Sequence, residues 1–276
     1  MAEQHGTDTA CGALLRWYVE QGVDEAIGAS PVNHFASDTT SDILDFSRNG
    51  PPPQPRSAPK QAPVAVIAAT AGPSADEAVQ AARTAAAACA THDELRAAVE
   101  AFDGCGLKQG ARNTVFADGM PGARLLIIGE APGRDEDRIG KPFVGRAGQL
   151  LDRMLGAIER SRETDTLISN VVYWRPPGNR APTQVEIAIC RPFVEKLIAI
   201  TRPKAVMLAG GVPMQAMLGM TGIMRLRGQW RDIELENGET YAALPVFHPA
   251  FLLRQPAQKR LAWRDLLALK ARLRDD

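Results

Sequence analysis

Four short apolar runs recur at intervals through the second half of the chain. They lie at 124–129, 167–172, 205–210 and 243–248, and the first reads Arg-Leu-Leu-Ile-Ile-Gly. Runs of this length that do not alternate apolar with polar residues are typical of strands buried on both faces of a parallel sheet. We therefore expect four buried, parallel strands.

Helical patterns, with apolar residues three and four positions apart, separate these runs. They cover 146–159, 185–200, 213–219 and 258–273. Strands that alternate with helices in this way predict a doubly wound α/β fold. The expected architecture has three layers, αβα, around a central four-stranded, mostly parallel sheet.

The first ninety residues have a different pattern. Residues 11–27 predict a short amphipathic helix, and 30–74 are rich in Pro, Ser, Thr and Ala. Residues 75–90 are rich in Ala and have few large apolar side chains that could dock a helix. Segments that bury little apolar surface tend to remain disordered. We expect an N-terminal extension over 1–90, made of a short helix and a disordered linker.

The folded domain is expected to begin at residue 91 and to run to residue 276. Thr91 and Glu94 have the spacing of a capping box, in which each side chain bonds a free N–H group at the start of a helix. The pattern that follows predicts a helix over 94–102.

Composition narrows the choice of partners and compartment. The 276 residues include 32 basic and 32 acidic side chains, so net charge provides no general attraction to nucleic acids or membranes. No apolar stretch approaches the roughly 20 residues that a membrane span requires, and the N-terminus lacks the pattern of a secretory signal. We expect a cytoplasmic protein without a membrane partner.

The cysteines show no complete metal site. They are Cys11, Cys89, Cys105 and Cys190, and no two of them form a Cys-x-x-Cys pair. Cysteines of cytoplasmic proteins are usually free thiols. Cys11 and Cys89 also fall in the extension that we expect to be mobile.

Glycines and polar residues gather where the predicted strands end. These positions are 129–133 (Gly-Glu-Ala-Pro-Gly), Asn170 with 175–180, 210–211 and 248–250. In doubly wound sheets, ligands bind beyond the carboxyl ends of the strands. The sequence therefore predicts a site at this edge of the sheet.

Two loops there suit a planar ligand. Gly-Glu-Ala-Pro-Gly lets backbone approach a ligand closely, although it also suits a tight turn with Glu130 in solvent. No Gly-Lys-Ser/Thr follows it, which excludes a P-loop. Phe143 lies in a loop beside Pro142, where its ring either stacks on a planar ligand or seals the loop against the core.

Two polar residues and a leucine pair also have two interpretations each. Asn170 lies in an apolar run, where its amide either reads a planar ligand or bonds a neighbouring loop. His248 either donates to an oxygen that gains negative charge or caps its strand. Leu252 and Leu253, beside Arg254, either form an exposed wedge between bases or begin a core helix.

Taken together, these motifs resemble those of the type-4 uracil-DNA glycosylases. The matching segments are Gly-Glu-Ala-Pro-Gly followed by Glu-Asp, then Gly-Lys-Pro-Phe-Val-Gly-Arg-Ala-Gly-Gln-Leu-Leu, then Asn-Val-Val with Arg-Pro-Pro-Gly-Asn-Arg, then His-Pro-Ala-Phe-Leu-Leu-Arg. They follow the family's order and cover about 102–273. The resemblance implies an enzyme that removes uracil from DNA and so starts base excision repair. Its expected partner is uracil-containing DNA, and we expect a monomer.

The resemblance also implies roles for single residues. Phe143 would stack on the flipped uracil, and Asn170 would bond its polar edge. Backbone around Glu130 and Ala131 would close the pocket. His248 would donate to uracil O2 as the glycosidic bond breaks.

Further roles concern water and DNA. Glu130, Glu136 and Asn179 are the candidates to place the attacking water at the sugar, and the sequence does not choose among them. Leucine side chains would fill the gap left by the flipped base. The implied DNA contacts are Arg180, Leu252, Leu253 and Arg254.

The chain departs from the family at the iron–sulfur cysteines. Type-4 members typically hold a [4Fe-4S] cluster on four cysteines. Here Phe102 stands at the first of these positions, Cys105 at the second, the pair 173–174 at the third and Cys190 at the fourth. We therefore expect no cluster and no metal, with Cys105 and Cys190 as remnants of the ligand set. Phe102 and Trp174 are expected to form an apolar plug in its place.

Other functions are weighed against this one. A catalytically weakened DNA-damage-binding module would have the same fold and motifs. A variant in this superfamily that bonds covalently to DNA has an inserted basic segment ending in His, and no such insert occurs near 219–230. An unrelated α/β hydrolase or nucleotide binder would need a nucleophile elbow or a phosphate loop, and neither is visible.

Overall fold

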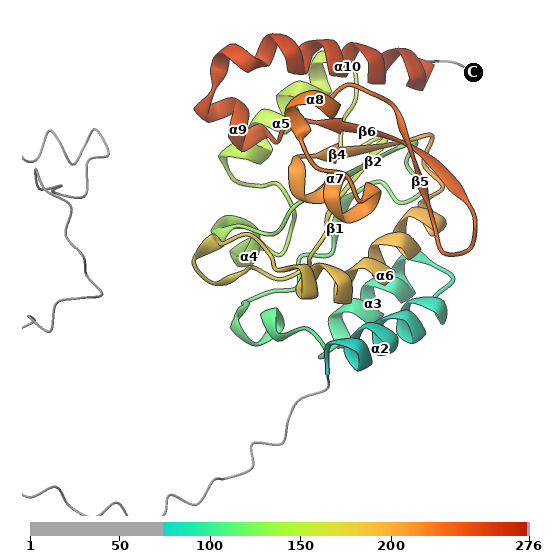
Figure 1. Ribbon diagram of the computed structural model, residues 1–276. Coiled ribbons are helices and arrows are strands. Elements are labelled where there is room, and N and C mark those ends of the chain that lie inside the picture. Colours follow the sequence, from blue (N-terminus) through green and yellow to red (C-terminus); the bar gives the residue numbers. More distant parts are fainter. Residues whose placement is uncertain (1–73, 275–276) are drawn as a thin grey trace, which may run out of the picture. The chain divides into compact units, whose positions relative to one another are not determined.

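Six strands form one sheet at the centre of the protein, which a computed structural model describes over residues 74–274 (Figure 1). They are β1 (Ala117–Gly119), β2 (Leu125–Gly129), β3 (Thr166–Asn170), β4 (Ala205–Ala209), β5 (Arg231–Glu234) and β6 (Thr240–Val246), in the order β1-β3-β2-β4-β6-β5. The four expected strands are β2, β3, β4 and β6, and every pairing among them is parallel. The parallel centre of the sheet is therefore confirmed.

Strands β1 and β5 extend the sheet from the expected four strands to six. Each pairs antiparallel at one edge, β1 with β3 and β5 with β6. β1 has three residues, and in β5 only Ile233 is buried. Because short, polar edge strands have no continuous apolar run, the hydrophobic pattern did not reveal them.

Helices cover both faces of the sheet, which confirms the three-layer αβα architecture. In Figure 1, α5 and α10 lie on one side of the sheet and α2, α3 and α6 on the other. Side chains alternate along β2: Leu126 and Ile128 join the core beneath α6, whereas Leu125 and Ile127 join the core beneath α5 and α10. The helices are α2 (Ala75–Ala87), α3 (His92–Ala101), α4 (Arg134–Ile139), α5 (Arg146–Ala157), α6 (Gln184–Thr201), α7 (Gly211–Leu218), α8 (Ile223–Leu226), α9 (Pro249–Arg254) and α10 (Lys259–Arg274), with 3₁₀ turns η1 (Gly106–Gly110), η2 (Pro177–Asn179) and η3 (Pro256–Gln258).

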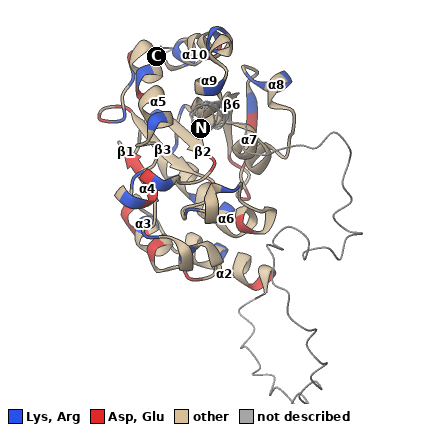
Figure 2. Cartoon of the chain, turned by 90° about the vertical axis from the view of Figure 1, so that its left-hand side faces the viewer, with Lys and Arg blue, Asp and Glu red and all other residues tan. Residues whose placement is uncertain are grey.

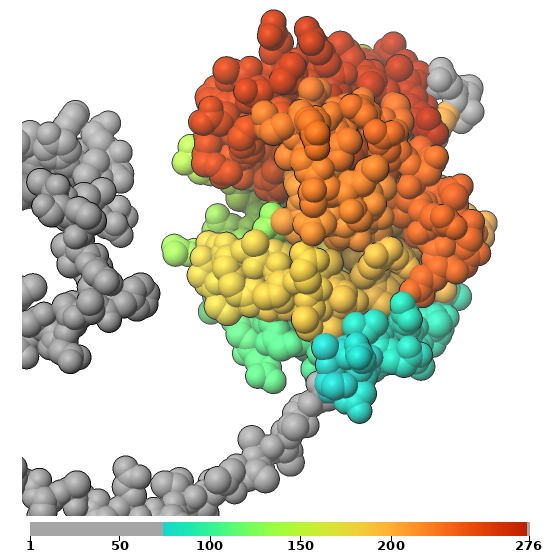
Figure 3. All heavy atoms as spheres, viewed as in Figure 1, coloured from blue at the N-terminus to red at the C-terminus, as the bar shows by residue number. Residues whose placement is uncertain are grey.

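Helix α2 brings the Ala-rich segment into the folded domain. Ala78, Ala82 and Ala86 lie four residues apart on one face of α2 and are buried. The helix lies against α6 (Figure 3), and small side chains allow two helices to approach closely. Ordered structure therefore begins before the capping box at Thr91, which itself is present as expected at the start of α3.

The expectations for residues 1–73, which include the helix over 11–27, the linker and Cys11, lie outside the described residues. Between residues 74 and 274, none of the helices combines the length and the apolar character that crossing a bilayer requires.

Candidate active site

A cavity of about 580 Å³ opens where β2, β3 and β6 end. This volume lies within the range of roughly 300–1,000 Å³ that is usual for small-molecule sites, and the position matches the edge expected from the sheet topology. The cavity brings together nine residues that the sequence singled out. They are Glu130, Ala131, Glu136, Phe143, Asn170, Asn179, Arg180, His248 and Arg254.

Gly129 allows two of these side chains to meet. It is the last residue of β2 and pairs in register with Asn170, the last residue of β3. A Cβ atom on Gly129 would lie 2.6 Å from Phe143 Cζ and closer still to Asn170 Oδ1. The missing side chain is thus what lets the amide and the phenyl ring lie side by side at the cavity.

The loop that contains Phe143 is held in an unusual conformation. Phe143 has a φ of 53°, in the left-handed region that bulky residues rarely adopt. The carboxylate of Glu136 fixes the loop from one side: Oε1 accepts the N–H groups of Val144 (3.0 Å) and Gly145 (2.9 Å), and Oε2 accepts that of Gly133 (3.1 Å). Glu136 therefore ties α4 to the loop through both of its oxygens.

His248 presents a neutral donor to the same cavity. Its Nδ1 accepts the N–H of Ala250 (3.1 Å), so the proton of the neutral ring lies on Nε2. Burial, aided by the positive charge of Arg254, lowers the pKa of His248 to about 4. The imidazole faces the Phe143 ring, with 5.6 Å between centroids and 28° between planes. His248 thus caps helix α9, not its strand, and keeps its Nε2–H for a further partner.

The remaining polar groups differ in how firmly they are held. Glu130 is half-buried at the cavity, and burial raises the pKa of its carboxyl group. Asn179 Oδ1 accepts a hydrogen bond from Arg175 Nε (2.7 Å). Arg180 forms a two-pronged ion pair with Glu186, at 2.8 and 2.6 Å. The rim of the cavity at η2 is therefore built from side chains that have protein partners already.

Of the two interpretations of Leu252 and Leu253, the structure favours a helix that packs on the core over an exposed wedge. Both belong to α9; Leu252 is 1% exposed within the core, and Leu253 is half-buried. Neighbouring residues on a helix point about 100° apart, so Leu252 points into the core while Leu253 is only partly covered by it. Neither leucine lines the cavity, whereas the exposed Arg254 does. In Figure 2, basic positions gather on α9 and α10 and mix with acidic ones on α4.

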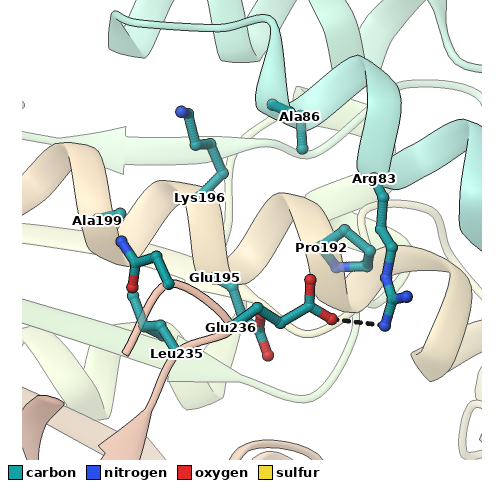
Figure 4. Close-up of a pocket in the computed structure, with 10 residues that line it drawn as sticks. Arg83, Ala86, Pro192, Glu195, Lys196, Ala199, Leu235 and Glu236 are labelled. Carbon is teal, nitrogen blue, oxygen red and sulfur yellow. Dashed lines mark hydrogen bonds and ion pairs between the residues drawn. The ribbon is translucent and has the colours of Figure 1, made fainter. Parts of the chain in front are cut away.

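A second pocket, of about 210 Å³, lies between α2, α6 and the turn that joins β5 to β6 (Figure 4). It shares no residue with the first cavity. Its side chains include an ion pair between Arg83 and Glu236 (2.5 Å) and several alanines. Because it has no aromatic wall facing polar donors, the first cavity is the candidate active site.

Cys105 and Cys190 lie together, as the resemblance implies. Both are buried and belong to the same core. The neighbouring Cys105 thiol and burial raise the pKa of Cys190 well above its usual range. Large side chains fill the surroundings: Phe102 packs against Phe193 with 5.1 Å between ring centroids. Trp174 is also buried in the same core.

These residues do not fit a [4Fe-4S] cluster. Such a cluster needs four thiolate ligands, and two of the four positions carry Phe102 and the pair 173–174. Cys89 is buried at the end of α2, where its thiol bonds Ala85 O (3.2 Å). In residues 74–274, no three His, Cys, Asp or Glu side chains are grouped so that they could hold a metal ion.

Five further cavity residues received no individual role from the sequence. They are Pro132, Gly133, Ala147, Pro176 and Ala250. All five lie within motifs that were recognised, so the motifs marked the right segments. The sequence did not show which apolar members of those segments face the cavity.

The fold and the site together define a doubly wound α/β protein with a cavity at the carboxyl edge of the sheet, lined by an aromatic ring, an amide and an imidazole. The model of the Uracil DNA glycosylase superfamily matches residues 116–267, which is more than half of the chain. The chain belongs to the uracil-DNA glycosylase superfamily.

Several relatives carry the name type-4 uracil-DNA glycosylase. That of Sulfurisphaera tokodaii is 34% identical over 174 residues, which cover 60% of this chain and 77% of the relative. That of Archaeoglobus fulgidus is 36% identical over 157 residues, 55% of this chain and 78% of the relative. That of Thermotoga maritima is 35% identical over 171 residues, 60% of this chain and 86% of the relative. The resemblance to type-4 members is therefore confirmed.

Proposed function

We propose that this chain is a uracil-DNA glycosylase, which hydrolyses the bond between uracil and deoxyribose in DNA and so begins base excision repair. One observation carries the proposal: Phe143, Asn170 and His248 line a single cavity at the carboxyl edge of the sheet.

Recognition would use the ring and the amide that meet over Gly129. A base inside a duplex is out of reach, so the enzyme must bind it after it has turned out of the stack. The Phe143 ring then offers an aromatic face, and the Asn170 amide offers both a donor and an acceptor to the polar edge of uracil. Arg254, exposed beside the cavity, would contact a phosphate, while the half-buried Leu253 reaches further outward than Leu252.

Catalysis would stabilise the charge that leaves with the base. The C1′–N1 bond breaks, its electron pair passes to uracil, and the N–H at His248 Nε2 donates to uracil O2. Water adds to C1′ and gives its proton to Glu130, from which uracil N1 receives it; the products are uracil and an abasic sugar. A neutral donor in place before the reaction is worth about 3–4 kcal/mol, or ~10²–10³ in rate.

The geometry favours Glu130 over Glu136 as the group that places water. Both oxygens of Glu136 accept backbone N–H groups, so its carboxylate acts on the loop. Burial raises the pKa of Glu130, which makes its carboxylate a better proton acceptor near neutral pH. Asn179 would support the water from the rim.

We further propose that the enzyme works without iron, because two of the four ligand positions carry Phe102 and the pair 173–174, and these large side chains are buried in the same core as the two remaining thiols. Iron analysis and the visible absorbance of protein purified without oxygen test this directly. Stoichiometric iron with cluster absorbance would contradict the proposal.

The activity is tested by single-turnover release of uracil from an oligonucleotide that contains one uracil, with a cytosine oligonucleotide as control. We expect release from wild type and a loss of about 10²–10³ in rate for His248→Ala, because the donor to O2 is gone. Asn170→Ala should also slow release. Unchanged rates in both variants would refute the site, and binding to uracil-containing DNA without release would show a damage-binding module instead.

A further inference from the structure

A largely buried arginine outside the cavity binds the Phe143 loop through carbonyl groups that Glu136 does not contact. Arg162 lies in the turn between α5 and β3, and its side chain is 12% exposed. It belongs to none of the motifs recognised in the sequence and does not line the cavity.

The guanidinium binds the peptide groups on both sides of Phe143. Nη1–H donates to the carbonyl of Pro142 (3.1 Å), and Nη2–H donates to the carbonyl of Phe143 (2.9 Å). These two carbonyls flank the Cα atom of Phe143, so fixing them fixes its φ and ψ together. The left-handed conformation costs a bulky residue about 1–2 kcal/mol and persists only where the surroundings impose it.

Two aspartates hold the guanidinium itself in place. Nη1 bonds Asp118 Oδ2 of β1 (2.9 Å), while Nη2 and Nε bond Asp152 Oδ1 of α5 (2.7 and 3.0 Å). Burial by itself lowers the pKa of Arg162, but the hydrogen bonds to Asp118 and Asp152 outweigh burial and raise it. Lys141 shares Asp118 at 2.9 Å. The planar fork of arginine suits this set of partners, whereas the point charge of lysine reaches fewer of them.

Arg162 and Glu136 form hydrogen bonds with different backbone groups of the loop. The guanidinium of Arg162 donates to the carbonyl oxygens of residues 142 and 143, and the carboxylate of Glu136 accepts from the N–H groups of residues 144 and 145. Four consecutive residues are therefore fixed by two buried or half-buried charges of opposite sign. A loop bound on both its donors and its acceptors keeps the ring of Phe143 in one position beside the cavity.

We propose that Arg162 is a positioning residue of the base-binding site, which acts by fixing the backbone on both sides of Phe143. This inference rests on the proposed excision of uracil. Displacement of a positioned group by about 1 Å is enough to cost ~10² in rate.

The first test compares arginines two residues apart in one turn. Arg162→Gln should lower the single-turnover rate of uracil release by about 10², and Arg162→Lys should fall between it and wild type. The matched control is Arg160→Gln, because Arg160 lies in the same turn and pairs with Asp165 (2.7 Å). That variant should lose stability without losing rate. Affinity for uracil-free duplex should stay unchanged in all three, since neither Arg162 nor Arg160 lines the cavity and both side chains are engaged by aspartates.

The second test asks whether the effect passes through Phe143. In a Phe143→Ala background the ring is absent, so Arg162→Gln should cause little further loss of rate. If Arg162→Gln lowered the rate of uracil release by the same factor with and without the Phe143 ring, the inference would be overturned. In the first test, wild-type rates in Arg162→Gln and Arg162→Lys would also overturn it. So would a loss of rate in Arg160→Gln equal to that in Arg162→Gln. Rates are measured below the unfolding temperature of the least stable variant. If wild type itself releases no uracil, the proposed function fails instead.

Discussion

The substitution Gly129→Ala tests the geometry of the cavity most directly. The added Cβ would lie 2.6 Å from Phe143 Cζ and closer to Asn170 Oδ1, whereas ordinary contacts begin at 3.4 Å. The ring and the amide must therefore move apart by about 1 Å. A shift of this size costs ~10² in rate, and forcing one methyl group into a packed site costs about 1–3 kcal/mol of stability.

The assay is single-turnover release of uracil, with the free energy of unfolding measured in urea on the same samples. The matched control is Gly156→Ala in α5, where a Cβ would meet nothing within 4 Å. This control should retain full activity and gain up to about 1 kcal/mol, because alanine favours helices over glycine. If Gly129→Ala folds and releases uracil at the rate of wild type, the ring and the amide do not form the binding surface inferred above.

Two further predictions concern stability. Folding lowers the pKa of His248 to about 4, against 6.5 for the free side chain. As the pH falls, the unfolded chain therefore binds a proton at this histidine before the folded chain does. The free energy of unfolding should consequently fall by up to about 3 kcal/mol as pH drops from 6.5 through 4. Urea titrations of wild type and His248→Gln at pH 7 and pH 4 test this, and an identical pH dependence in both would contradict it. Ala82→Leu should cost about 1–3 kcal/mol because Ala82 is fully buried in α2, whereas Ala81→Leu at an exposed neighbour should cost little. Equal thermal midpoints for these two variants would show that α2 does not pack on α6.

The sheet contains strands that a local hydrophobic pattern predicts and strands that it does not. Strands β2, β3 and β4 are buried along their whole length and β6 is buried from residue 243 onward, and such burial leaves a mainly apolar signal in a short stretch of sequence. β1 and β5 leave no such signal because they are short edge strands. Leu252 and Leu253 are adjacent in the chain, and only the packing of α9 on α5 decides which of them is buried.

For the site, the sequence by itself determined which groups gather at one edge of the sheet: a glycine-bounded acid after one strand, an amide at the end of the next, an aromatic loop and a histidine at the last strand. Local turn and strand patterns place such groups at one edge of a parallel sheet. Only the tertiary structure decided how they are held. Arg162 lies some twenty residues from the loop it binds, and α2 docks through alanines that carry no pattern of their own. Contacts of this kind depend on which distant segment folds alongside, and a local pattern has no information on that.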